Sequence, residues 1–356
     1  MLIAPALSLA ETGLARKSEV QDTIYTLSNN TAQNEVLSFQ RTSNGMVVAG
    51  RFSTGGRGTG GGLGNQGALE LSKDGAYLFA VNPGSNDLSV FSVGIAGQLT
   101  LIDRAGDLGT RPVSVTVDHN RVYVVNAGDD SIYGYTFNRK QGKLSPLANS
   151  HKNLSGTGTA PAQISFDNEG EALVVTEKAT NKITTFALDE ANTPADGVSY
   201  NSAAPTPFGF YFGKRNQLFV SEAVGGSQGA SSLSSYNIDE DGVLELISGP
   251  VRDTETAACW VVTTPNGRIA YTTNTGSSSI SSYTIKPGGK LILLQAIAAK
   301  TAAPTDLAIS VDGKILYALS VGAKTIDVFN IDKNGALTKL VNVGALATGV
   351  TGLVVR

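Results

Sequence analysis

Residues 68–102 read ALELSKDGAYLFAVNPGSNDLSVFSVGIAGQLTLI, and this stretch decides the fold. Its short runs are rich in Val, Leu and Phe and alternate apolar with polar residues, which is the pattern of half-buried β-strands. A DG pair, a Gly/Ser/Asn run and a later glycine separate the strands, and these residue types favour tight turns. The stretch therefore predicts four antiparallel strands joined by short turns.

The same order of strands and turns recurs along the chain. The residue that ends each second strand marks the period, and these residues are Asn82, Asn126, Glu177, Glu222, Asn274 and Ser320. They are separated by 44 to 52 residues, a spacing typical of propeller blades built from four strands each. Helical repeats of this length would show a 3.6-residue periodicity, and the sequence shows none.

Six complete units leave a partial unit at each end of the chain. Residues 23–52 supply three strands, and GLVVR at residues 352–356 supplies a fourth. Pairing them in one blade closes the ring and leaves no sheet edge exposed. We therefore predict an all-β fold, a seven-bladed β-propeller closed by its N- and C-terminal strands, as a single domain over residues 22–356.

Composition agrees with this architecture and excludes several functions. The 356 residues include 41 glycines and only 16% charged residues, which suits many short strands and turns. The net charge is −3 and no basic run exceeds two residues, so a nucleic-acid or anionic membrane surface is not expected. No apolar run is long enough to span a membrane. We expect a monomer that binds a small molecule.

The first ten residues, MLIAPALSLA, are apolar and lack the basic start of a secretory signal. We interpret residues 1–21 as a flexible segment or the remnant of a signal peptide. A secreted or periplasmic location and a cytoplasmic one therefore stay equally open.

In a propeller, the second strands end on the face where the inner strands begin, so two rings of side chains converge at one channel mouth. Glu177 and Glu222 end adjacent second strands, and paired carboxylates can divide the roles of general base and general acid. The sequence therefore nominates these two residues as catalytic. The amides that end the other second strands are candidates for substrate binding, with strand capping as the alternative: Asn82, Asn126 and Asn274.

The starts of the inner strands supply the second ring of candidates, which are Arg111, Gln163, Phe208, Trp260 and Asp306. Arg111 precedes the rigid Pro112 and is placed to hold a substrate carboxylate. Trp260 and Phe208 are candidates for an apolar wall. The alternatives are packing between blades for Trp260 and a solvated loop charge for Arg111.

Residues 53–67 read STGGRGTGGGLGNQG. No GK[ST] ending and no helix follows, so we do not interpret the run as a phosphate-binding loop. It predicts a long loop that borders the pore, with Arg57 reaching over the mouth as a candidate lid. The ring of Asn and Glu oxygens also suits a hard cation such as Ca²⁺. Because only two ring members are anionic and DxDxDG-like loops are absent, we expect no cofactor and keep a calcium site as an alternative.

Three motifs carry a family resemblance: SKDGAYLFAVNPGSNDLSVF at 72–91, LVVTEKATNKITTF at 173–186 and TAACWVVTTPNG at 256–267. The chain resembles the lactonase-type seven-bladed propellers, the family of bacterial 6-phosphogluconolactonase and fungal 3-carboxy-cis,cis-muconate cyclase, over residues 23–356. It is most similar to the members labelled 3-carboxymuconate cyclase-like.

The resemblance implies lactone chemistry, with a lactone or an organic acid as the small-molecule partner, but it carries over incompletely. Family enzymes open one inner strand with Pro-His and the next with Pro-Arg-His; here Pro112 precedes valine, and Pro161 precedes Ala162 and Gln163. Only the glutamate matches, at Glu177. The missing Arg and His weaken the case for a phosphorylated lactone, because a phosphate requires cationic partners.

Our leading hypothesis is an enzyme that opens or closes a lactone ring, by hydrolysis or cycloisomerisation. Glu177 would act as general base and Glu222 as general acid, while Asn126 and Asn274 would stabilise developing oxyanion charge. Two alternatives stay open: a non-catalytic propeller that binds a small molecule or a protein, and a metal-dependent lactonase or lyase.

Overall fold

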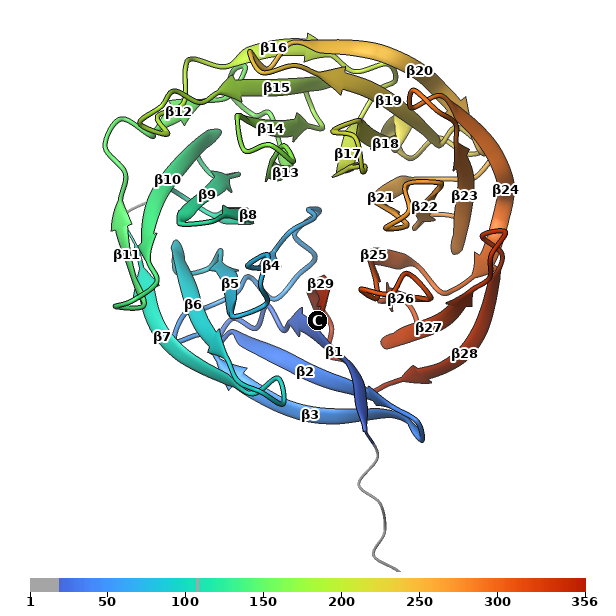
Figure 1. Ribbon diagram of the computed structural model, residues 1–356, viewed down its shortest axis with the longest axis horizontal. Helices are drawn as coiled ribbons and strands as arrows, with labels where there is room; N and C mark the ends of the chain where they lie inside the picture. Colours follow the sequence, from blue (N-terminus) through green and yellow to red (C-terminus); the bar gives the residue numbers. More distant parts are fainter. Residues whose placement is uncertain (1–18, 107–108) are drawn as a thin grey trace, which may run out of the picture.

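The computed structural model describes residues 19–106 and 109–356, and within them the chain forms a ring of seven antiparallel sheets, six of four strands and one of five (Figure 1). The predicted seven-bladed β-propeller is confirmed. Residues 1–18, on which most of the predicted N-terminal segment falls, lie outside the described residues.

Each blade runs from an inner strand at the channel to an outer strand at the rim. The inner strands, from blade 1 to blade 7, are β29 (Thr351–Val355), β4 (Leu69–Leu71), β8 (Pro112–Asp118), β13 (Pro161–Phe166), β17 (Pro207–Phe212), β21 (Ala258–Thr263) and β25 (Pro304–Ile309). The second strands are β1 (Val20–Leu27), β5 (Tyr77–Asn82), β9 (Arg121–Asn126), β14 (Ala172–Glu177), β18 (Leu218–Glu222), β22 (Ile269–Asn274) and β26 (Ile315–Ser320).

The two remaining strands of each blade form its outer half. The third strands are β2 (Glu35–Thr42), β6 (Asp87–Val93), β10 (Ser131–Asn138), β15 (Lys182–Ala187), β19 (Ser232–Ile238), β23 (Ser279–Ile285) and β27 (Thr325–Ile331). The outer strands are β3 (Gly45–Ser53), β7 (Leu99–Ala105), β11 (Lys143–Pro146), β16 (Val198–Asn201), β20 (Leu244–Arg252), β24 (Leu291–Lys300) and β28 (Leu337–Val343). Two short additions are β12 (Lys152–Asn153), paired with β10, and a 3₁₀ turn at Val224–Gly226. Among the described residues no helix is long and apolar enough to cross a membrane.

The last strand closes the ring, as predicted. β29 pairs antiparallel with β1, so that blade 1 contains both ends of the described chain (Figure 1). At the end of this pair, Thr23 and Arg356 exchange two backbone hydrogen bonds of 2.9 Å each. The closure removes the free edge at which a sheet would otherwise pair with another chain.

Apolar side chains pack between neighbouring blades as well as within them. One buried cluster combines Tyr25 of blade 1, Phe79 of blade 2 and Val115 of blade 3. Tyrosine hydroxyls add polar links between blades: Tyr25 Oη donates to the Gly97 carbonyl at 2.8 Å, and Tyr271 Oη donates to the Gly335 carbonyl at 2.8 Å. Each link satisfies a buried hydroxyl and ties one blade to a turn of the next.

Ring closure predicts a difference between two leucine truncations. Leu353 of β29 is 5% exposed and packs in the cluster between blades 7 and 1, whereas Leu340 of β28 is 50% exposed. Leu353→Ala should lower the free energy of unfolding by about 2–5 kcal/mol, because it leaves a cavity in this cluster. Leu340→Ala should change it by less than about 0.5 kcal/mol. Urea unfolding monitored by tryptophan fluorescence measures both, and equal losses would contradict this account of closure.

Candidate functional site

A cavity of about 510 Å³ lies on the propeller axis, within the size range of small-molecule sites. In six blades the inner strand contributes a residue that pairs with the position three before the end of the second strand, and in blade 1 Val354 pairs with Tyr25, two before the end of β1. These seven residues all line the cavity: Glu70, Thr116, Ser165, Tyr211, Val262, Ala308 and Val354. We call them the lower ring. Strand register therefore brings together seven side chains from residues spread over most of the chain.

Alternate side chains of a strand point to the same face, so the residues two positions before the lower ring also face the channel. This upper ring includes Gln163, Trp260 and Asp306, three of the residues nominated from the sequence. Gln163 and Asp306 line the cavity. The cavity opens where the inner strands end, since its lining includes the exposed residues Tyr211 and Val311. This is the face opposite the mouth on which the sequence analysis centred.

The glycine-rich run does not border the pore but enters it. Val115 N donates to the Gly67 carbonyl at 2.8 Å, and Gln66 N donates to the Ala162 carbonyl at 3.0 Å. Asn65 Nδ2 donates to the Val113 carbonyl, which also crosses to blade 3. We call residues 64–67 the plug; the loop that leads to β4 reaches toward the axis in Figure 1. The prediction of a lid at the border is therefore corrected, because the segment is built into the channel wall.

Close packing explains part of the glycine content of this loop. A Cβ on Gly58 would lie 2.2 Å from the Asn29 backbone, and one on Gly84 would lie 2.1 Å from the Gly58 carbonyl oxygen. Any larger residue would push these loops apart. Arg57, expected to reach over the mouth, lies instead against a hollow between blades 1 and 2.

Glu70 is the one carboxylate of the lower ring. It makes no hydrogen bond or ion pair with the described residues, and burial raises its pKa to about 8. Its charge also raises the pKa of the neighbouring Tyr211 hydroxyl, a smaller effect than the burial of that group. A carboxyl group with a pKa near neutrality is suited to accept and return a proton.

Two polar groups of the upper ring complete the cavity. Gln163 Oε1 accepts a 2.7 Å hydrogen bond from Phe210 N, which directs the amide group and leaves its N–H₂ to donate. Asp306 is 2% exposed; burial holds its pKa well above the usual range, against hydrogen bonds from the backbone of Leu307 and Leu353. A protonated Asp306 and the Gln163 amide both act as hydrogen-bond donors.

The cation in the cavity lining is already paired. Lys73 Nζ lies 2.8 Å from Asp118 Oδ1. Asp118 also contacts Arg121 and His119, and these partners hold its pKa well below the usual range although burial opposes them. Lys73 is therefore not a free cation at the rim of the cavity.

The mouth where the inner strands begin holds a cationic and aromatic cluster. Phe208 and Trp260 lie in contact, with ring centroids 5.0 Å apart, and Lys178 Nζ lies 4.9 Å from the Phe208 centroid. Lys178 donates to the carbonyls of Gly64 and Pro161 at 2.7 and 3.0 Å. Burial, with the nearby charge of Arg111, lowers the Lys178 pKa to about 8. Arg111 is exposed.

The two nominated glutamates do not share this mouth. Glu177 is 0% exposed, and its carboxylate accepts hydrogen bonds from Ser155 N, Ser155 Oγ, Thr180 Oγ1 and Thr184 Oγ1. Glu222 is also 0% exposed; Ser232 Oγ donates to its Oε2 at 2.7 Å. Each carboxylate turns toward the third strand of its own blade. Their catalytic roles stay a prediction, and this geometry does not favour them because neither group lines the axial cavity.

The side chains of the asparagines that end second strands also turn toward the third strand of their own blade. Asn82 Nδ2 donates to Asp87 Oδ1 at 2.6 Å and to Ser89 Oγ at 2.7 Å. Asn274 Nδ2 donates to Ser281 Oγ at 2.7 Å, and Asn126 Nδ2 donates to Ser131 Oγ at 3.2 Å. These contacts tie the second strand to the third, which agrees with strand capping. Within the described part of the chain no group of three His, Cys, Asp or Glu side chains is arranged to hold a metal ion.

Sequence reasoning missed Glu70 and Lys178, although both left a signal. Glu70 stands inside ALELS, an inner strand, where the other copies carry Thr, Ser, Tyr, Val or Ala. A lone carboxylate at a channel-facing position is such a signal, but the position can be recognised as channel-facing only when the strand register is known. Lys178 directly follows Glu177 in the sequence, yet its Nζ lies against backbone carbonyls of the plug and of β13.

The fold and this cavity define a β-propeller with a cavity of small-molecule size on its axis. The sequence matches the family described as "Lactonase, 7-bladed beta-propeller" over residues 18–157, 113–212 and 244–351. The chain therefore belongs to the lactonase family of seven-bladed β-propellers. This membership supports the expectation of an enzyme of the lactonase type.

Individual relatives are distant. The chain is 22% identical over 327 residues to the probable 6-phosphogluconolactonase of Arthroderma benhamiae, across 83% of this chain and 79% of that protein. A putative 6-phosphogluconolactonase from Bacteroides uniformis has a similar structure, with a TM-score of 0.76, 17% identity and coverage of 96% and 100%. The Pseudomonas aeruginosa periplasmic gluconolactonase PpgL gives a TM-score of 0.71, 15% identity and coverage of 93% and 98%. These two structural likenesses establish the fold alone.

Burial of Glu222 predicts a pH dependence of stability. Burial raises its pKa to about 7, so the folded protein retains a proton that the unfolded chain releases above about pH 4.5. The unfolding free energy should therefore fall as pH rises from about 4.5 to 7, and Glu222→Gln should remove this part of the fall. Urea unfolding at pH 5 and pH 8 measures it.

Glu177→Gln serves as the matched control for that experiment. Its amide cannot accept all four hydrogen bonds, so we expect a loss of about 1–3 kcal/mol in unfolding free energy. Identical pH profiles of wild type and Glu222→Gln would contradict the account of Glu222.

Proposed function

We propose that the protein hydrolyses a small, unphosphorylated lactone in the axial cavity, with Glu70 as the general base. The observation that carries this proposal is the position of Glu70: an unpaired carboxyl group, with its pKa raised to about 8, in a cavity of substrate size. Family membership supports lactone chemistry. Nearby polar groups supply the other elements that an acyl-transfer site needs.

In the proposed reaction, ionised Glu70 takes a proton from a water molecule as the water oxygen attacks the lactone carbonyl. The carbonyl oxygen becomes an oxyanion, to which the Gln163 amide and protonated Asp306 donate hydrogen bonds. The tetrahedral intermediate then breaks its bond to the ring oxygen. Glu70 returns the proton to that oxygen, and the product is an open-chain hydroxy acid.

The charge of the lining favours an unphosphorylated substrate. A phosphate group requires cationic donors, and Lys73, the cation of the lining, is occupied by Asp118. Arg111 and Lys178 stand near the opposite mouth, beyond the plug. A neutral sugar lactone matches the hydroxyl and amide groups of the cavity better.

Substitution of Glu70 tests the base. Glu70→Gln should lower kcat at pH 8 by about 10²–10⁴-fold, because the amide cannot accept the proton of water. In the wild-type protein, kcat should rise with pH through about 8 as Glu70 ionises. Titration of the acid released from glucono-δ-lactone, after subtraction of spontaneous hydrolysis, measures both.

Two comparisons separate this proposal from its rivals. Glu222→Gln, which changes a buried carboxyl group outside the cavity, should retain wild-type kcat. Loss of activity in Glu222→Gln with full activity in Glu70→Gln would reverse the assignment in favour of the glutamates at the ends of the second strands. A higher kcat/KM for the 6-phosphorylated lactone than for glucono-δ-lactone would contradict the choice of substrate.

Gln163 offers a test of oxyanion stabilisation. Gln163→Leu keeps the size of the side chain but removes the amide donor, so kcat should fall by about 10²–10³-fold with little change in KM. Steady-state kinetics on the same lactone measure this split. A rise in KM with unchanged kcat would show that Gln163 only binds the substrate.

A further inference from the structure

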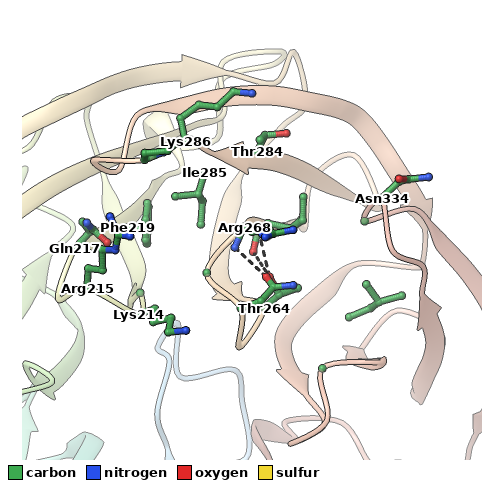
Figure 2. A pocket seen from close by; sticks show the side chains of 18 of the residues that line it. Lys214, Arg215, Gln217, Phe219, Thr264, Arg268, Thr284, Ile285, Lys286 and Asn334 are labelled. Atoms are coloured by element: carbon green, nitrogen blue, oxygen red, sulfur yellow. Dashed lines mark hydrogen bonds between the residues drawn. The ribbon is translucent and has the colours of Figure 1, made fainter.

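A second hollow, of about 870 Å³, lies away from the axis among turns of blades 5, 6 and 7 (Figure 2). Turns between inner and second strands contribute Lys214, Arg268 and Lys314, and turns between third and outer strands contribute Lys286 and Lys333. We call this hollow the basic groove. It is separate from the axial cavity, with which it shares no lining residue.

Positive side chains far outnumber negative ones in the basic groove. Six cations line it, all of them exposed: Lys214, Arg215, Arg268, Lys286, Lys314 and Lys333. Asp332 is the one acid of the lining, and its Oδ1 accepts hydrogen bonds from the backbone of Asn334 and Ala336. Among the cations only Lys314 forms an ion pair within the described chain, with Asp312 at 3.3 Å. A protein of net charge −3 thus gathers unneutralised positive charge in one hollow.

The turns that carry these cations have fixed geometry. Gly267 N donates to the Thr264 carbonyl at 2.8 Å, Gly289 N to the Lys286 carbonyl at 2.9 Å and Gly335 N to the Asp332 carbonyl at 3.0 Å. Each of these glycines has a positive φ that closes its turn. The ordered backbone of these turns therefore carries the cations into one hollow, where their positive potential attracts an anion.

Neutral polar groups stand between the cations. Asn266 Oδ1 accepts hydrogen bonds from Thr264 Oγ1 at 2.8 Å and Arg268 N at 3.0 Å, so the amide is oriented with its N–H₂ free to donate (Figure 2). Gln217 and Asn334 also line the groove. Amides of this kind recognise hydroxyl groups, whereas the lysines and arginines recognise carboxylates.

We propose that the basic groove binds an acidic oligosaccharide, a chain of sugars that each carry a carboxylate. The charges are spread over three blades, which fits repeated carboxylates, and the amides between them fit sugar hydroxyls. A nucleic-acid strand fits less well, because stacking needs exposed aromatic faces and Phe219, the aromatic residue of the lining, is 1% exposed.

Calorimetric titration with tetragalacturonate tests the proposal on the full-length protein. Wild type should bind it at one saturable site, more weakly at 150 mM than at 20 mM salt, since the contacts are ionic. The triple variant Lys214→Gln, Arg268→Gln, Lys333→Gln should bind about tenfold more weakly or worse. Lys140→Gln is the matched control, because it removes an exposed lysine from the corresponding turn of blade 3, and should leave the affinity unchanged.

Three results would overturn the proposal. These are the absence of saturable binding to wild type, an unchanged affinity in the triple variant, and an equal loss in Lys140→Gln. Inorganic polyphosphate or single-stranded DNA of matched charge, bound as tightly as tetragalacturonate, would show that the groove recognises charge alone and would also reject an acidic sugar. Binding is measured without turnover, so this outcome is independent of the lactonase proposal.

Discussion

The pairing of β29 with β1 is the constraint on which the rest of the structure depends. The backbone hydrogen bonds between Thr23 and Arg356 join the two ends of a ring in which each blade packs against two others. The same strand places Val354 in the lower ring. Closure and cavity formation are therefore one event: without β29 the ring has two open edges, and the axial cavity lacks one of its seven walls.

Local chemistry is what made the fold predictable. Turn residues and alternating strands repeat in every blade, so the period, the number of blades and the closing strand follow from short-range patterns. The site was predictable only in part. Gln163 and Asp306 stand on inner strands and do line the cavity. Glu177 and Glu222 end their strands on the expected face, yet hydroxyl groups of the same blade, such as those of Thr184 and Ser232, turn the carboxylates away from the mouth.

Features that depend on contacts between distant segments were out of reach. A glycine-rich run has no periodicity, so nothing in residues 53–67 distinguishes a loop over the pore from one inserted into it. The basic groove could not be predicted from the sequence for the same reason. The net charge of −3 and the absence of long basic runs reflect only the order of residues along the sequence. The folded propeller, in contrast, brings single cations from separate turns together in the basic groove. Lys214 and Lys333 lie in different blades and reach the same hollow only after folding.

The plug affects how a ligand enters and leaves the axial cavity. A propeller channel is open at both ends in principle, but residues 64–67 hydrogen-bond to blades 3, 4 and 6 and so occupy the channel on one side of the axial cavity. A ligand of the axial cavity would then enter and leave by the mouth where the inner strands end, so that a slowly departing product would delay the next substrate. The depth of the axial cavity is set by the loop between β3 and β4 rather than by any blade. Changes in that loop alone would thus open the channel at both ends while the ring of blades stays the same.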